Sequence, residues 1–239
     1  MAAAGSADLA EVLKQADQFH HDEAVADCYR VLDEAYKAGE RSPELLWRLG
    51  RSCYTMGNEC ADKAEKQAFM TRGLELVKAS VEADGNNWAS QKWHGILLGS
   101  MGEFVSTKEK IGNAYIIKEK FQKAAELKPD DATTHHCLGK WCWSVLQVGM
   151  IERGLAATLF ATPPSSTYEE CEASLLKSHE LDPNQIYNNL LMGDLKYQQR
   201  KWSEAYKWYS QAAALPPKTE HAKALVAEAT KKAKSCEGY

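Results

Sequence analysis

The sequence predicts an all-α protein built from consecutive helical hairpins. Three observations point to this fold class. Proline and glycine are scarce inside long stretches rich in Ala, Leu, Glu, Lys and Gln, which are good helix formers. Apolar residues recur with helical spacing, and strand-like alternation is almost absent. Similar groups of large and small apolar residues also recur along the chain, and such internal repetition is typical of stacked hairpins.

Length, charge and cysteine usage exclude several classes of protein. With 239 residues, 44% hydrophobic and 26% charged, the chain has the composition of a folded domain. Its net charge of -4 argues against a nucleic-acid binder, which is usually basic. No apolar stretch reaches 18 residues and the first residues do not resemble a signal peptide, so we expect no transmembrane segment. Seven cysteines without C-x-x-C spacing favour a reducing, cytoplasmic compartment over a disulfide scaffold.

The predicted elements follow one another as a single continuous domain. Residues 1–7 are expected to be a flexible start, and residues 8–41 an N-terminal helical hairpin. Residues 42–217 hold four irregular repeats, each of which ends at a glycine or proline that stops its second helix. Residues 218–239 form a basic closing helix and tail, because a repeat array needs a cap over its last apolar face.

The clearest repeat spans residues 186–217. Gly193 and Ala205 are expected on facing helices, where small side chains let two backbones approach, and Pro217 ends the second helix. This alternation of large and small residues resembles the tetratricopeptide repeat, a 34-residue helical hairpin. The sequence departs from that pattern at Asn189, where a tryptophan is expected. The fold class is therefore predicted as a tetratricopeptide-like helical-hairpin superhelix, an α-solenoid with long and interrupted repeats.

Two insertions explain why the earlier repeats are longer than the last one. Residues 56–68 are polar and prolong the helices of one hairpin, whereas residues 149–167 are apolar and interrupt another. The second insertion is expected to be either a lid over a ligand or a plug in the groove. Three of its residues share one predicted helical face and form the candidate lid: Leu155, Leu159 and Phe160.

The order of these irregular repeats resembles one family more closely than the generic repeat. Residues 45–54 read Leu-Leu-Trp-Arg-Leu-Gly-Arg-Ser-Cys-Tyr, residues 136–143 read His-Cys-Leu-Gly-Lys-Trp-Cys-Trp, and the second insertion ends Ala-Thr-Pro-Pro-Ser-Ser-Thr. With residues 42–217 as a whole, these segments are similar to the repeat domain of the regulator of microtubule dynamics family.

That resemblance implies a cytoplasmic helical-repeat protein that associates with microtubules, the spindle and spindle poles. Its expected work is to regulate microtubule dynamics and chromosome segregation through protein–protein interaction. Some members carry an amino-terminal membrane anchor and act at organelle contacts, where the repeat domain resembles a lipid-binding module. The sequence begins without such an anchor, which favours a soluble, spindle-type member and leaves lipid binding or transfer as the alternative.

No pattern in the sequence is typical of an active site or a cofactor site. The phosphate-binding loop, the nucleophile elbow and the H-E-x-x-H zinc helix are all missing, so we expect no enzyme, no catalytic residue and no cofactor. His135, His136, Cys137 and Cys142 lie close in sequence, but zinc needs about four converging ligands. We favour the interpretation that these histidines and cysteines are structural and that the chain holds no metal.

The first helix of each hairpin in this fold lines a concave groove. Mapping the groove positions predicts aromatic rings with cations such as Arg51 and Lys140 between them, a surface suited to an acidic peptide or a phospholipid headgroup. The alternative is that Trp47, Tyr54 and Trp143 fill the groove from within. The predicted groove residues are Trp47, Arg51, Tyr54, His94, Leu98, His136, Lys140, Trp143, Tyr187, Asp194 and Tyr197.

Basic residues of the closing helix form a second candidate contact. Lysines there would meet the acidic surface of a microtubule through salt-sensitive attraction. The alternative is a solvated helix face, because lysines are favoured near a helix carboxyl terminus. The candidate residues are Lys223, Lys231, Lys232 and Lys234.

Overall fold

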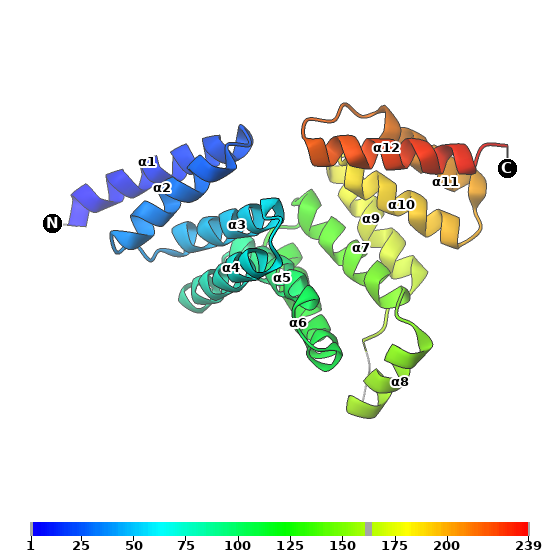
Figure 1. The fold of residues 1–239 in the computed structure, drawn as a ribbon, viewed down its shortest axis with the longest axis horizontal. Helices are drawn as coiled ribbons and strands as arrows, with labels where there is room; N and C mark the ends of the chain where they lie inside the picture. The colour runs from blue at the N-terminus through cyan, green and yellow to red at the C-terminus, as the bar shows by residue number, and fades with distance from the viewer. Residues whose placement is uncertain (1, 161–163, 239) are drawn as a thin grey trace. The chain divides into compact units, whose positions relative to one another are not determined.

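Helices occupy most of the chain in the computed structural model, which describes residues 2–160 and 164–238. Within those residues the secondary structure consists of twelve α-helices and one short 3-10 turn, without a strand (Figure 1). The helices group into two compact units, Met1–Leu127 and Lys128–Tyr239, which we call unit 1 and unit 2. No helix of the described residues combines the length and the apolar composition needed to cross a membrane.

Unit 1 contains three hairpins. In each one the first helix packs against the second, and α2 and α4 also pack against the first helix of the next hairpin. Helix α1 already begins at Ala2, so the predicted flexible start is helical; its alanines are strong helix formers. The pairs are α1 (Ala2–His21) with α2 (Val25–Lys37), α3 (Pro43–Glu59) with α4 (Lys63–Ala83), and α5 (Trp88–Ser100) with α6 (Thr107–Leu127).

Unit 2 contains two hairpins and the closing helix. The apolar insertion forms helix α8 between the two partners of the first hairpin, and Figure 1 shows α8 standing apart from the other helices of its unit. The pairs are α7 (Ala132–Leu146) with α9 (Tyr168–Leu181) and α10 (Ile186–Gln198) with α11 (Trp202–Ala214). Helix α12 (Glu220–Ser235) packs on α11 as the predicted cap, and α8 spans Met150–Leu159.

Polar caps and turn residues set the helix ends. Ser42 accepts a hydrogen bond from Leu45 at the start of α3, and Thr167 and Glu170 form a reciprocal capping box at the start of α9. The second helices end two or three residues before the turn residues expected to close the repeats. Those turn residues are Gly85, Pro129, Pro183 and Pro217.

In four of the five hairpins, a glycine of the first helix lies where the two helices cross. A Cβ atom added to Gly193 would lie 2.4 Å from the Tyr209 ring, so only glycine permits this approach. The same clash recurs in three earlier hairpins, where the added Cβ would lie 2.5 Å from the partner side chain. Those pairs are Gly50 with Val77, Gly95 with Phe121, and Gly139 with Leu175. In these four hairpins the crossing glycine therefore fixes the rotation of the first helix, and with it the residues that face the groove.

Candidate ligand-binding groove

The crossing glycines define the groove register in four hairpins. In the hairpins of Gly50 and Gly139, the predicted groove residues lie three residues before and one and four residues after the glycine. In the hairpin of Gly193 they lie six residues before it, at Tyr187, and one and four residues after it. Applied to Gly95, the offsets of Gly50 and Gly139 select Lys92, Ile96 and Gly99 in α5 rather than His94 and Leu98. The predicted register of this hairpin therefore differs by two residues from that of the other two.

The contacts of Leu98 favour the shifted register. Leu98 lies in a core cluster with Met70 and Val77 of α4, so it faces the partner helices instead of the groove. The His94 ring is 8% exposed, and its pKa falls to about 4 because burial and the nearby Lys120 disfavour its charge. The difference has a physical origin, since α5 is buried on several faces, with polar as well as apolar residues, and its helical periodicity is therefore weak.

The groove positions of α3 in unit 1 are filled by the chain itself. Trp47 is 9% exposed, and the guanidinium carbons of Arg48 and Arg51 lie 4.2 and 5.1 Å from its ring centroid. Asp17 of α1 binds both arginines, at 2.8 Å from Arg48 and 3.1 Å from Arg51. Tyr54 is half-buried, with its ring 5.7 Å from the ring of an α5 tryptophan. The cation predicted to meet a ligand here is instead committed to an internal ion pair.

His136 in unit 2 is also structural. Its Nδ1 atom lies 3.0 Å from Oδ1 of Asn188, and its ring meets the Tyr187 ring edge to face with centroids 4.5 Å apart. Burial lowers the pKa of His136 to about 4, so the imidazole is neutral at neutral pH. The neighbouring groove position, Lys140, is exposed. Among these two predicted cations, only the lysine presents a charge to solvent.

Four predicted residues meet in one pocket of unit 2, which we call the groove pocket. Trp143 comes from α7, Asp194 and Tyr197 come from α10, and Lys232 comes from α12. The cavity has a volume of about 650 Å³. The lining therefore combines three predicted groove residues with Lys232, which was predicted as part of the basic contact. The other lining residues are Gln198, Arg200, Trp202, Tyr209 and Ser235.

An ion pair forms one side of the groove pocket. Asp194 Oδ1 accepts hydrogen bonds from the Tyr209 hydroxyl at 2.8 Å and from Lys232 Nζ at 2.7 Å, and Glu228 also pairs with Lys232 at 2.6 Å. Burial opposes the charge of Lys232, but its bonds to the two carboxylates raise its pKa overall. Burial and the bond to Asp194 both raise the pKa of Tyr209, so its hydroxyl remains a donor.

Aromatic rings and an exposed guanidinium form the rest of the groove pocket. Tyr197 is 43% exposed, and its ring meets the Trp202 ring edge to face with centroids 4.7 Å apart. Arg200 lies in the α10–α11 turn with a φ of 60°, which is rare for a residue other than glycine. A guanidinium binds carboxylates in a bidentate fork, and aromatic walls accept apolar groups. The pocket is therefore suited to an acidic segment that also carries an apolar side chain.

Arg200 and Trp202 were missed in the sequence because only first-helix positions were mapped to the groove. Both lie after the first helix, in the turn and at the start of the second helix. The signal that would have found them is the run Arg200-Lys201-Trp202, in which two cations adjoin an indole at a tight hairpin turn.

The candidate lid does not line the groove pocket within the part of the chain that the structure describes. Leu159 is 37% exposed and Phe160 is half-buried, and neither belongs to the lining. The Leu155 side chain lies outside the described residues. The lid and plug interpretations of α8 thus receive no support from the pocket geometry.

The basic residues of α12 differ in their contacts. Lys223 pairs with Glu220 one turn earlier, and Lys232 is committed to the groove pocket. Lys231 and Lys234 are exposed on the last turns of the helix. The carboxyl end of α12 therefore presents positive charge beside the pocket.

The residues weighed as metal ligands have other roles. His135 Nε2 lies 2.8 Å from the Pro129 carbonyl oxygen, and Cys142 is buried. Across residues 2–160 and 164–238, no group of three or more His, Cys, Asp or Glu side chains is placed to hold a metal ion.

Comparison with known proteins places this architecture in a family. Residues 12–237 match the family described as regulator of microtubule dynamics protein 1-3. Regulator of microtubule dynamics protein 1 of Bos taurus is 37% identical over 230 residues, which cover 95% of this chain and 72% of that protein. Regulator of microtubule dynamics protein 3 of Mus musculus is 30% identical over 223 residues, covering 90% of this chain and 46% of that protein.

Solved structures confirm the predicted fold class. A thermophilic TPR protein of Thermus thermophilus superimposes with a TM-score of 0.65 at 16% identity, covering 92% of this chain and 98% of that one. The pilF protein of Pseudomonas aeruginosa gives a TM-score of 0.60 at 14% identity, covering 98% and 90%. At these identities the likeness shows the tetratricopeptide-like fold alone. The family match over most of the chain goes further and confirms the resemblance seen in the sequence: the chain belongs to the regulator of microtubule dynamics family.

Proposed function

We propose that this chain acts as a non-catalytic scaffold that associates with microtubules or spindle proteins in the cytoplasm and so regulates microtubule dynamics and chromosome segregation. The groove pocket of unit 2 holds an acidic segment of the partner. The observation that carries this proposal is the meeting of Trp143, Tyr197 and Lys232 with Arg200 around one cavity. Family membership supports the link to microtubules.

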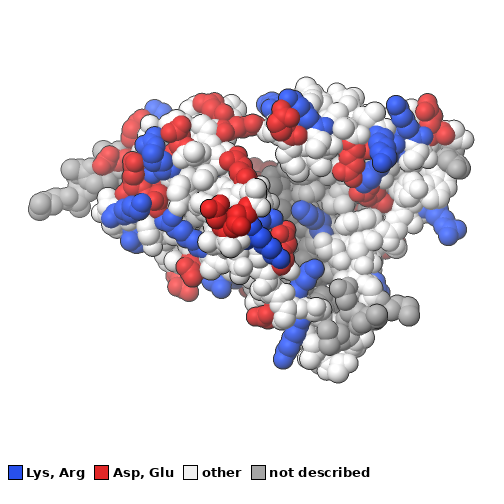
Figure 2. Space-filling model, in the orientation of Figure 1, with Lys and Arg blue, Asp and Glu red and all other residues white. Residues whose placement is uncertain are grey.

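The charge distribution favours a local contact over a broad electrostatic one. On the face shown in Figure 2, Lys and Arg side chains are interspersed with Asp and Glu side chains and with uncharged surface. The chain as a whole carries a net charge of -4. A contact with an acidic partner must then rely on exposed cations such as Arg200, Lys231 and Lys234, whose attraction is short-ranged and sensitive to salt.

Two buried titratable groups of unit 2 serve packing, which supports a non-catalytic role. His136 is paired with Asn188, and Lys196 bridges Glu172 and Glu204 at 2.6 and 2.9 Å. These pairs hold neighbouring helices together.

Co-sedimentation with polymerised tubulin tests the proposal, with a matched pair of tyrosine variants. Tyr197 and Tyr206 are 43% and 39% exposed, but only Tyr197 lines the groove pocket. We expect the bound fraction to fall as salt rises, and Tyr197→Ala to weaken binding about tenfold, since an aromatic anchor contributes about 1–2 kcal/mol. Tyr206→Ala should bind as the unmodified chain does. Absence of binding at low salt would remove the proposal, and equal effects of the two variants would remove the pocket from it.

Native mass spectrometry of the purified chain separates this proposal from the lipid alternative. A chain that carries no added mass agrees with a protein-binding scaffold. An added mass of lipid size, lost in the Tyr197→Ala variant, would instead assign the groove pocket to an amphiphile.

A further inference from the structure

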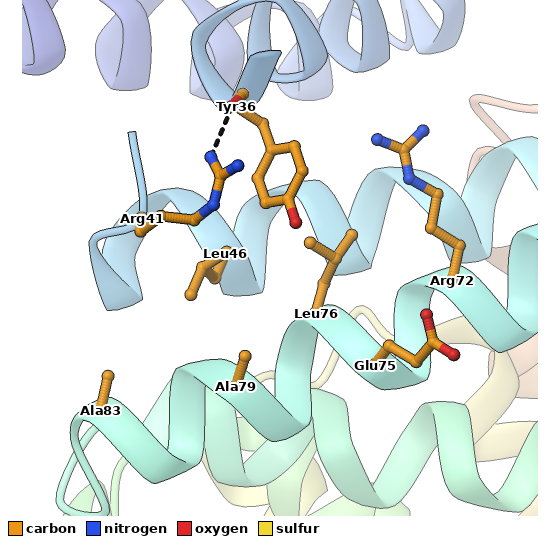
Figure 3. Close-up of a pocket in the computed structure, with 8 residues that line it drawn as sticks. All are labelled: Tyr36, Arg41, Leu46, Arg72, Glu75, Leu76, Ala79 and Ala83. Atoms are coloured by element: carbon orange, nitrogen blue, oxygen red, sulfur yellow. Dashed lines mark hydrogen bonds between the residues drawn. The ribbon is translucent and has the colours of Figure 1, made fainter. Parts of the chain in front are cut away.

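A second cleft lies in unit 1, away from the groove positions. It has a volume of about 380 Å³ and opens between α2 and α4, with α3 behind it (Figure 3). Because α2 and α4 are both second helices of their hairpins, this cleft is separate from the surface that the first helices form. Its lining residues are Tyr36, Arg41, Leu46, Arg72, Glu75, Leu76, Ala79 and Ala83.

The floor and lower wall of this cleft are apolar. Leu46 of α3 and Leu76 of α4 are 3% and 5% exposed, so their side chains are already part of the core. Ala79 and Ala83 follow one turn apart on α4 and are exposed. Their small side chains leave a shallow apolar groove along α4, which would accept an aliphatic or aromatic side chain of a ligand.

Two guanidinium groups flank one tyrosine ring at the upper wall. The Arg41 and Arg72 guanidinium carbons lie 3.6 and 6.0 Å from the centroid of the Tyr36 ring. The Arg72 guanidinium is already hydrogen-bonded within the chain, because it donates to Asp33 and to the Tyr29 hydroxyl. Arg41 is the exposed member of the pair.

Arg41 retains hydrogen-bond donors for a ligand. Its Nη1 atom alone makes the side-chain hydrogen bonds found among the described residues, to the carbonyl oxygens of Tyr36 and Glu40. An arginine has five N–H donors, so the Nε and Nη2 edge remains for a carboxylate. The cleft also reaches the first turn of α3 through Leu46, where the helix dipole favours negative charge.

The carboxylates around the cleft leave the Arg41 end open to an anion. Asp33 is bound to Lys37 and Arg72, which lower its pKa against the opposing effect of burial. Glu40 accepts hydrogen bonds from the backbone N–H groups of Arg41 and Ser42, and these bonds, together with the charge of Arg41, lower its pKa. Glu75, the one acid among the lining residues, lies at the opposite end from Arg41 in Figure 3.

We propose that this cleft is a second peptide-binding site, which takes a segment where an acidic residue adjoins an apolar one. The carboxylate binds the Nε and Nη2 edge of Arg41, and the apolar side chain lies over Leu46, Leu76 and Ala79. This site is independent of the groove pocket and of the proposed function, so each can fail without the other.

Two peptides that differ only in charge test the proposal on the full chain. Acetyl-Glu-Leu-Glu-Leu-Glu-amide and its analogue with Gln at every Glu are titrated into ¹⁵N-labelled protein, and amide chemical shifts are followed. We expect the acidic peptide to shift the amides of Leu46, Ala79 and Ala83 in a saturable manner. The Gln analogue should bind at least tenfold more weakly, since charge-assisted hydrogen bonds are about twice as strong as neutral ones.

Three variants connect the shifts to the cleft. Arg41→Gln should lose the binding, whereas Arg30→Gln removes an exposed arginine of α2 outside the lining and should retain it. Ala79→Glu places a negative charge on the exposed wall without altering the end of α2, and it should also lose the binding. Retention of binding in Ala79→Glu, equal binding of the two peptides at these amides, or an absence of shifts at Leu46, Ala79 and Ala83 would each overturn the proposal. Shifts of the same amides caused by phosphatidylserine vesicles and not by the acidic peptide would overturn the assignment to a peptide.

Discussion

Replacing Gly95 with alanine is expected to destabilise unit 1, although the same replacement at Gly99, on the same helix, is expected to stabilise it. Alanine is favoured over glycine in a helix by about 1 kcal/mol, and both variants gain this term. At Gly95 the new Cβ would lie 2.5, 2.8 and 2.9 Å from three carbons of the Phe121 ring, and such overpacking costs about 1–3 kcal/mol. At Gly99 the nearest atom is Ile117 Cδ1 at 3.8 Å, an ordinary contact. The difference between the two variants therefore isolates the clash, at about 1–3 kcal/mol.

Urea unfolding followed by far-UV circular dichroism measures this difference. The Phe121→Leu background provides a further check, because a smaller partner side chain should reduce the cost of Gly95→Ala. If both glycine variants gained the same free energy of unfolding, the close approach of α5 to Phe121 at Gly95 would be contradicted. The groove register of α5 would then lose its support, since Lys92 and Ile96 are assigned to the groove by that crossing.

Two further predictions concern buried polar pairs in unit 2. The pKa of His136 is lowered to about 4 in the folded chain, against about 6.5 when unfolded, so folding stability present above pH 6.5 is lost as the pH falls toward 4. His136→Gln should show a smaller loss over that range in urea titrations at several pH values, and an identical pH dependence would contradict the assignment. Lys196→Met should destabilise the chain by about 1–3 kcal/mol because it leaves Glu172 without its cation, and Glu172→Gln in the same chain should restore part of that loss in thermal unfolding. If Lys196→Met were as stable as the unmodified chain, the ion pair of Lys196 with Glu172 would contribute nothing to the free energy of unfolding.

Much of the fold could be predicted from local signals. Helix ends follow from residues such as Ser42, Pro129 and Pro183, whose effect on the backbone depends only on their neighbours in sequence. A closing helix and tail were predicted over residues 218–239, and α12 spans Glu220–Ser235 within that range.

The residues that line the groove were harder to predict from the sequence. Around Gly50 and Gly139 the predicted groove residues keep one spacing from the glycine that contacts the second helix. Around Gly95 the helix carries apolar residues on several faces, and the predicted residues differ from that spacing by two. The ion pairs of Arg51 with Asp17 and of Lys232 with Asp194 join residues 34 and 38 positions apart, a distance over which no local pattern operates.

The sequence by itself determined the all-α class, the order of the hairpins and the family, because helix propensity, turn residues and repeat spacing act over short stretches of chain. Only the tertiary structure decided which groove positions remain open. Trp47 and Arg51 are closed off by the α1–α3 ion pair, whereas Trp143 and Tyr197 border a cavity with the exposed Arg200. The physical reason is that a cation is available to a ligand only if no carboxylate of the folded chain reaches it first, and that depends on which helices pack together.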